Sequence, residues 1–452
     1  MKTGRRTMIS LLLLDTLSVG LVFNAVRLLY DLHGFISWPL LGPVAFVIVS
    51  LYLIDGYKPQ TDMLSLEYTS QHSIALLSAM IGTLLITFVI IPSDYSLQQS
   101  RAVVGISFLA LVPLTLSYRR FSSYLQNKKR RGRSIVFLGD HTSALEFMEE
   151  CALAEMTQPV VHASTHSVEA DKNAHPGAGV PVSQVLTQIA KGQLGVEALV
   201  LRESNSELTP EVSQQLVDLY FKGVPTYTLE LFHQLYWRKI PLYRLNQTWL
   251  FQEGFHIARE PVYERLKRIS DIGFGLFGFV LSIPVFVFAG IAIWLEDRGP
   301  VLFKQTRIGQ NRRPFSVYKF RSMRQNVTGI PYAQVADNRI TKVGRFLRAS
   351  RLDELPQILN VIKGEMSLIG PRAEWARLVA DYEQQIPCYH FRHLVRPGIT
   401  GWAQVNYPYG ANIGDTQRKL EYDLYYIRHF SFRLDASIIL KTIHVMIFGK
   451  GR

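Results

Sequence analysis

Two adjacent carboxylates, Asp353 and Glu354, are the residues of this sequence whose chemistry and setting are most suggestive of catalysis. They follow a basic segment that contributes Arg345, Arg348 and Arg351. A nearby positive charge favours the ionised form of a carboxyl group, so these arginines should keep Asp353 charged and nucleophilic. An ionised carboxylate can attack phosphorus, while a second one can hold a divalent cation. Adjacent acids are also common on solvated helix surfaces, so the pair alone is weak evidence.

A second group of basic residues lies upstream, in a glycine-punctuated stretch from 299 to 325. Short strands around glycine turns should bring its cations close together; they are Lys304, Arg307, Lys319, Arg321 and Arg324. Converging cations fit the recognition of a pyrophosphate, although any one of them could belong to a solvated face. Phosphate and carboxylate oxygens are also the hard ligands that suit Mg²⁺.

The carboxylates need local elements that present them to these cations. The pattern predicts an arginine-rich helix from Gly344 to Ser350, an exit from Arg351 to Pro356, and another helix beginning near Pro356. The pair would then lie at a helix junction.

The first 120 residues predict a membrane domain. Four apolar segments approach the roughly 20 residues that a helix needs to cross a bilayer; they run from Met8 to Leu29, Ile36 to Ile54, Ile74 to Ile91 and Val103 to Tyr118. Basic residues cluster at the amino terminus and between Arg119 and Arg133, which predicts that both regions are cytoplasmic. The second cluster should anchor the topology and meet anionic headgroups. Asp15, inside the first segment, should be solvated or paired with another helix.

Residues 133–225 predict a degenerate Rossmann-like module. Strands at 134–138, 159–163 and 198–201 alternate with helices up to 154, at 182–190 and at 210–221. Only Gly139 of a phosphate-binding fingerprint is present, and Asp140 would put a negative charge where the phosphate should sit. Dinucleotide binding is therefore not expected. A linker, 226–263, carries aromatic anchors that should lie on the membrane or on the last domain: Tyr236, Trp237, Tyr243 and Trp249.

A further apolar run, Ile272 to Leu295, is long enough to span the membrane. Pro284 inside it would kink a helix, so the segment can be a plain span or a re-entrant helix that returns to the same face. The shorter run from Leu434 to Phe448 predicts an amphipathic helix on the last domain or at the interface.

The overall composition limits the class of protein less than the positions of the charged residues do. The formal charge of +13 over 452 residues suits nucleic acid, anionic lipid or phosphate-bearing substrates equally. Apolar segments beside the basic clusters favour lipid and phosphate, and no nucleic acid is expected. Cys151 and Cys388 are far apart and lack metal-ligand spacing, so both should be structural thiols.

Several stretches of the last domain, 264–452, together resemble one family. They are Lys267-Arg268 with Asp271, Gly299-Pro300-Val301, Tyr318 to Met323, Arg348 to Asn360, Lys363 to Arg372 and Arg396 to Val405. This set resembles the monotopic phosphoglycosyl transferases, or bacterial sugar transferases. The four apolar segments and the middle module resemble its long exopolysaccharide polyprenyl glycosylphosphotransferase subgroup.

The resemblance implies an activity and roles for residues. Asp353 would attack the β-phosphorus of a UDP-sugar and release UMP, after which undecaprenyl (polyprenyl) phosphate would take the sugar phosphate. Glu354 would bind Mg²⁺, and Pro284 would break a re-entrant helix. The phosphate-binding residues would be Lys319, Arg321, Arg348 and Arg372. Two positions depart from the family pattern: Ile283 separates Ser282 from Pro284, and Ala373, which Glu374 follows, stands where many members have a second proline.

The predicted architecture is a membrane α plus α/β protein: four transmembrane helices, a Rossmann-like cytoplasmic module and a re-entrant-helix α/β catalytic domain. It would lie in the bacterial inner membrane, with its active site on the cytoplasmic face. Anionic lipid is an expected partner, and a homo-oligomer through the membrane helices or the middle module stays open. The alternatives are a non-catalytic scaffold of a polysaccharide assembly complex and a glycosyltransferase that releases UDP.

Overall fold

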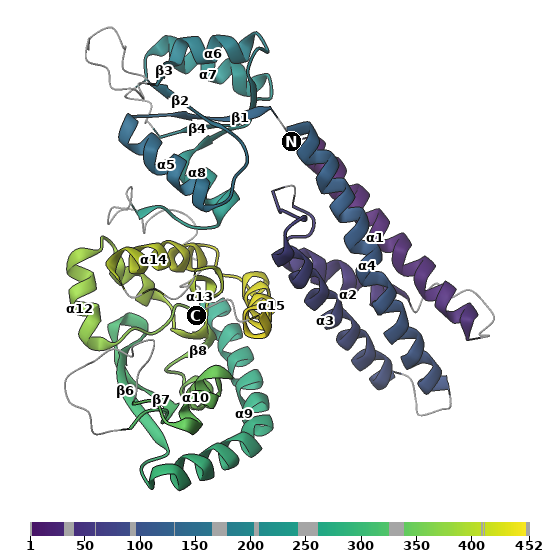
Figure 1. The fold of residues 1–452 in the computed structure, drawn as a ribbon, viewed down its shortest axis with the longest axis vertical. Helices are drawn as coiled ribbons and strands as arrows, with labels where there is room; N and C mark the ends of the chain where they lie inside the picture. Colours follow the sequence, from purple (N-terminus) through teal and green to yellow (C-terminus); the bar gives the residue numbers. More distant parts are fainter. Residues whose placement is uncertain are drawn as a thin grey trace. The chain divides into compact units, whose positions relative to one another are not determined.

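The computed structural model describes residues 2–30, 40–58, 60–90, 96–130, 132–164, 179–202, 208–242, 261–324, 339–407, 410 and 412–448. The chain divides into two compact units, Met1–Arg238 and Lys239–Arg452. Figure 1 shows the elements of each unit.

The first unit begins with the apolar helices α1 (Lys2–Leu29), α2 (Leu41–Leu53), α3 (Leu66–Ile90) and α4 (Ser96–Arg130). Helices α1, α3 and α4 are long and apolar enough to cross a membrane, as predicted for three of the four segments. The second predicted segment contains α2, a described helix of 13 residues. The start of that prediction, at Ile36, lies outside the described residues.

A buried ion pair joins α1 to α4. Arg119 donates two hydrogen bonds to the carboxylate of Asp15, at 3.1 and 2.8 Å, and neither side chain is exposed. Tyr57 and Tyr118 also donate their hydroxyl groups to Asp15. Asp15 is therefore paired with another helix, one of the two predicted outcomes. Arg119 does not meet headgroups as the basic-cluster prediction expected, because it is fully enclosed.

The rest of the first unit is built on a parallel five-stranded sheet. The strands are β1 (Arg133–Leu138), β2 (Val160–Ser164), β3 (Val180–Pro181), β4 (Gly195–Leu201) and β5 (Thr226–Thr228), in the order β3-β2-β1-β4-β5. Helices α6 (Val182–Ala190) and α7 (Pro210–Phe221) cover one face, and α5 (His141–Leu153) and α8 (Leu229–Phe232) cover the other (Figure 1). The alternation of strands and helices agrees with the sequence-based expectation.

The turn after β1 is closed by the protein's own side chains. Asp140 caps α5 by accepting a hydrogen bond from the Ser143 amide at 3.1 Å, and it also pairs with Arg202. The carboxylate thus occupies the helix amino terminus where a phosphate would otherwise bind.

The linker aromatics do not behave as a group. Tyr236 and Trp237 lie in the π-helical turn η3 (His233–Trp237) and pack against the core beside the five-stranded sheet. Tyr236 stacks on Phe232, with ring centres 4.2 Å apart. The prediction that they lie on the membrane or the last domain was wrong, because η3 continues directly from α8 into that core. Tyr243 and Trp249 lie outside the described residues.

The second unit holds the elements that form the candidate site. A long helix, α9 (Pro261–Asp297), precedes the antiparallel hairpin β6 (Leu302–Ile308) and β7 (Pro314–Phe320), with the 3₁₀ helix η7 (Gln310–Arg312) between its strands. Then follow α10 (Lys342–Ala349), the 3₁₀ helix η8 (Leu352–Gln357), α11 (Ile358–Lys363) and β8 (Ser367–Ile369). The remaining elements are α12 (Ala376–Gln385), the 3₁₀ helix η9 (Tyr389–Leu394), β9 (Gly398–Thr400), α13 (Trp402–Asn406), α14 (Ile413–Arg428) and α15 (Phe432–Phe448).

Helix α9 is also long and apolar enough to cross a membrane. It contains Pro284, and Figure 1 shows that the helix changes direction along its length. The Ser282 hydroxyl donates to the carbonyl of Phe279 at 2.9 Å, one residue before the Val280 carbonyl that the proline leaves without its helical donor. Length and apolarity alone do not separate a span from a re-entrant helix.

Candidate active site

The two carboxylates lie just after α10. The Thr341 hydroxyl caps this helix by accepting from the Gly344 amide at 2.9 Å. Gly344 packs against Ser322 so closely that an added Cβ would lie 2.2 Å from the Ser322 carbonyl oxygen, so no larger residue fits. Arg351 then adopts a left-handed conformation (φ 55°), which turns the chain into η8 with Asp353 and Glu354 in its first turn. The predicted helix junction is confirmed.

Glu354 is held by two cations from other elements. Its Oε1 atom accepts from the Lys319 ammonium at 2.6 Å and from the Arg372 guanidinium at 2.9 Å. Burial raises the pKa of Glu354, but Arg372 and Lys319 outweigh that effect and hold the pKa well below its ordinary value. The structure therefore brings together Glu354, Lys319 and Arg372, as the resemblance implied.

Asp353 has a different electrostatic setting from the one predicted. Burial and the adjacent Glu354 carboxylate raise its pKa, and they outweigh the lowering by Lys319, Arg348 and Arg372. The expectation that the surrounding arginines dominate was wrong for this group, because burial has the largest effect on its pKa. The carboxyl group of Asp353 is consequently more basic than an ordinary aspartate.

The three arginines of the basic segment have different surroundings. Arg348 faces the carboxylates and donates from Nε to the Ser322 hydroxyl at 2.9 Å. Arg345 and Arg351 are exposed. Arg351 lies beyond the end of α10, which closes at Ala349.

The hairpin also divides the predicted cation group. Lys319 is opposite Phe303, whereas Lys304 is opposite Tyr318, so the two lysines point to opposite faces. Lys304 instead lies over the Tyr318 ring, 5.6 Å from its centre. Its predicted convergence with Lys319 was therefore wrong.

The other members of that group also differ in their settings. Arg307 shares the Lys319 face and lowers the pKa of that lysine, although burial is the larger cause. Arg321 is buried against Asp297 at the end of α9, so its phosphate-binding role stays a prediction that requires this pair to open. Arg324 is exposed.

Asn360, the last residue of one of the stretches that resemble the family, fixes the strand that carries Lys319. Its side-chain oxygen accepts from the Tyr318 amide at 3.1 Å, and its nitrogen donates to the Ser316 carbonyl at 2.7 Å. The fully buried amide thus completes the free edge of β7. A polar residue among the apolar positions of α11 was the available signal.

The described side chains supply only part of a metal site here. The described residues contain no group of three or more His, Cys, Asp or Glu side chains that could hold one. Glu354 accepts from both Lys319 and Arg372 through Oε1. One or two carboxylates with substrate phosphates are the usual Mg²⁺ ligands, so the pair of Asp353 and Glu354 fits a phosphate-bridged Mg²⁺ and not a cage made by protein alone.

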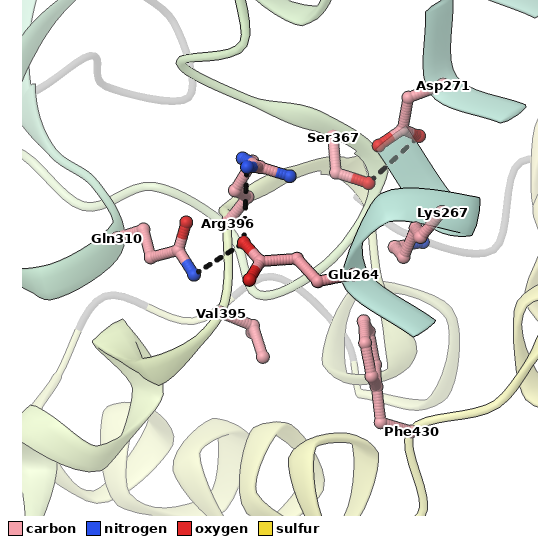
Figure 2. Close-up of a pocket in the computed structure, with 8 residues that line it drawn as sticks. All are labelled: Glu264, Lys267, Asp271, Gln310, Ser367, Val395, Arg396 and Phe430. Carbon is pink, nitrogen blue, oxygen red and sulfur yellow. Dashed lines mark hydrogen bonds and ion pairs between the residues drawn. The ribbon is translucent and has the colours of Figure 1, made fainter. Parts of the chain in front are cut away.

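Polar contacts fix the first turns of α9 to the rest of the unit around a small cavity (Figure 2). Asp271 accepts from the Ser367 hydroxyl at 3.0 Å, and Glu264 pairs with Arg396 at 3.2 Å. Ser367 begins β8, which leads to Arg372. The apolar helix and the strand next to the site are therefore fastened to each other.

Comparison with known proteins agrees with this geometry. The model of the bacterial sugar transferase family matches residues 262–449. The chain is 42% identical over 195 residues to the exopolysaccharide production protein PSS of Rhizobium leguminosarum bv. phaseoli, covering 41% of this chain and 98% of that protein. The chain belongs to the bacterial sugar transferase family.

The chain is also similar to two longer relatives. A UDP-N-acetylgalactosamine-undecaprenyl-phosphate N-acetylgalactosaminephosphotransferase of Aeromonas hydrophila is 38% identical over 262 residues, which are 58% of this chain and 61% of that protein. A UDP-glucose:undecaprenyl-phosphate glucose-1-phosphate transferase of Escherichia coli (strain K12) is 42% identical over 182 residues, 39% of each chain. The chain therefore spans less than two thirds of the length of these two relatives. Their names agree with the long exopolysaccharide subgroup.

Proposed function

We propose that this chain transfers a sugar 1-phosphate from a UDP-sugar to undecaprenyl (polyprenyl) phosphate, with release of UMP, and so initiates an exopolysaccharide or another surface glycan. The observation that carries the proposal is the Glu354 carboxylate held between Lys319 and Arg372 directly beside Asp353. The names of the Aeromonas and Escherichia relatives describe this class of reaction.

The reaction proceeds in two displacements at one phosphorus atom. An oxygen of Asp353 attacks the β-phosphorus of the UDP-sugar, the bond from that phosphorus to the bridging oxygen breaks, and the electron pair leaves with UMP. An oxygen of the polyprenyl phosphate then attacks the same phosphorus and returns the Asp353 carboxylate. The product is a polyprenyl diphosphate sugar, and no redox partner or external proton is required.

The cations around the pair suit such a phosphoryl transfer. Charge builds on the phosphate oxygens and on the leaving group, and fixed guanidinium and ammonium groups stabilise it without reorganisation. Arg348, Arg372 and Lys319 all act electrostatically on Asp353 and could hold such oxygens. Mg²⁺, held by Glu354 and the substrate phosphates, would neutralise the pyrophosphate charge when bound.

The membrane setting completes the proposal. Helix α9 enters the cytoplasmic leaflet of the bacterial inner membrane and returns at Pro284, which keeps the site on the face where nucleotide sugars occur. The strand order β3-β2-β1-β4-β5 supports a Rossmann-like module that serves a structural or regulatory purpose. Anionic lipid would meet the exposed basic residues at the cytoplasmic face, and a homo-oligomer is compatible with either unit.

The deciding experiment measures nucleotide products with the full chain in membranes, undecaprenyl phosphate and a panel of UDP-sugars. UMP supports the proposal, UDP supports a glycosyltransferase, and neither product supports a scaffold. Asp353→Asn should abolish UMP release and the phosphosugar-labelled protein. Wild-type activity in that variant would overturn the covalent step. Labelling from the periplasm of a cysteine placed after residue 300 would overturn the re-entrant topology.

A further inference from the structure

The segment that carries Arg372 has no regular secondary structure, yet its main chain is hydrogen-bonded at each successive residue. The Gly370 amide donates to Thr400 at 2.9 Å, and the Pro371 carbonyl accepts from the Gly398 amide at 2.9 Å. The next three carbonyl groups, of residues 372, 373 and 374, also accept hydrogen bonds from other segments. Such a segment can place one side chain accurately without belonging to a helix or sheet.

Two of those three carbonyl groups are bound by arginine side chains. Arg392 donates to the Arg372 carbonyl at 2.9 Å, and Arg307 donates to the Ala373 carbonyl at 2.5 Å. The third carbonyl, of Glu374, accepts from the Ile308 amide at 3.1 Å. The main chain of the residue that binds Glu354 is thus held by a guanidinium group from a different element.

Arg392 itself is firmly fixed. It lies on η9 with 6% of its surface exposed, and it donates to Asp423 at 2.8 Å and to the Tyr389 hydroxyl at 2.6 Å. Asp423, on α14, is 1% exposed. Because a buried ion pair often contributes little net stability, stability alone is a weak explanation for placing this pair under the segment.

We propose that Arg392 is a positioning residue of the active site: held by Asp423, it fixes the main chain at Arg372 and thereby the guanidinium group that faces Glu354 and the donor phosphates. The proposal rests on the proposed function, since it assigns Arg392 an effect on that reaction. Arg392 has no role among the residues that the sequence singled out, and it touches neither carboxylate of the pair.

Arg392 also reaches the segment at Glu374, whose carboxylate lies 3.8 Å from the guanidinium group. The arginine therefore contacts the segment at both residues 372 and 374.

A double-mutant cycle separates positioning from general stability. The variants are Arg392→Lys, Arg372→Ala and their combination, measured as kcat/KM for the UDP-sugar from UMP release, with Tm measured in parallel. Arg392→Lys should lower kcat/KM about tenfold in the wild-type background, because small displacements of a catalytic group are costly. In the Arg372→Ala background the same change should alter kcat/KM less than about twofold, since the group being positioned is gone.

Equal losses in both backgrounds would overturn the proposal. If Arg372→Ala leaves too little turnover, the same cycle is measured as the Kd for the UDP-sugar in the Asp353→Asn background. If Arg392→Lys does not fold, Asp423→Asn replaces it and should show the same dependence on Arg372. Arg428→Lys, in the last turn of α14, is the matched control and should change neither quantity. An inactive wild type would instead contradict the proposed function.

Discussion

Lys319 donates to Glu354 at 2.6 Å although the two residues lie 35 positions apart, one on a hairpin strand and the other in a 3₁₀ turn. Arg372 shares the same carboxylate oxygen. Glu354 therefore does two things: it holds two cations close together, and its charge makes the neighbouring Asp353 more basic. Neither effect requires Lys319, Arg372 or Asp353 to move.

Glu354→Gln should reduce UMP release by roughly two orders of magnitude or more, because the fixed charges that the site presents to a phosphate are disturbed. Lys319 and Arg372 lose their common counter-charge, so the Tm should fall as well. Both are measured on the full chain in membranes. Glu383→Gln removes a carboxylate that pairs with the exposed Arg312, and it should leave both quantities nearly unchanged. Comparable activity of the two variants would contradict the assigned role.

Asn360→Ala should destabilise the second unit by roughly 2–4 kcal/mol, since it leaves the half-buried Tyr318 amide and Ser316 carbonyl without their partner. The expected signs are a lower Tm and a loss of UMP release caused by movement of Lys319. Gln384→Ala, at an exposed amide of α12, provides the control. An unchanged Tm would show that the edge of β7 does not depend on this amide.

Asp15→Ala should sharply lower the stability of the membrane helices, by roughly 3–5 kcal/mol, because Arg119 is left buried without its counter-charge. The double replacement Asp15→Leu with Arg119→Leu removes both charges and should recover much of the loss. Tm and the yield of folded protein in detergent measure both. A double variant that is no better than the single one would indicate that the pair is needed for more than charge balance.

His393 predicts a pH dependence of stability. Burial and the neighbouring Arg392, Arg312 and His390 lower its pKa to about 3, so the folded chain keeps this imidazole neutral. Below about pH 6.5 the unfolded chain binds a proton that the folded chain does not, and stability falls as the pH falls towards 3. His393→Gln should reduce that slope by up to about 1.4 kcal/mol per pH unit, measured as Tm between pH 7 and 5. An unchanged slope would show that a group other than His393 causes the pH dependence of stability.

Local patterns were sufficient to predict much of the fold. The strand and helix alternation of the sheet unit, the α10 to η8 junction and α15 all follow from short-range periodicity and turn residues. Periodicity could not predict which face a hairpin residue occupies, because that depends on register. Lys304 was consequently grouped with Lys319 although the strand places it on the other face.

The sequence indicated which residues could form the site, but not how their charges affect one another. The sequence supplies arginines next to Asp353, and it does not show how the charges are shared. Only the folded chain brings Arg372 to Glu354 and buries Asp353, and this raises the pKa that the arginines alone would lower. Arg392 was missed because its contact is to a main-chain carbonyl, which no side-chain motif records.

The short stretch after Trp237 has a practical consequence for dissecting the protein. Trp237 lies in the core of the sheet unit, whereas Ile240 is fully buried in the core of the second unit and its amide donates to Glu421 at 3.0 Å. An expressed fragment limited to the family segment, from residue 262, would lack Ile240 and open a hole in its own interior. An expressed fragment should therefore begin at Lys239. Poor solubility of a shorter catalytic fragment would be explained by the loss of Ile240 from its core.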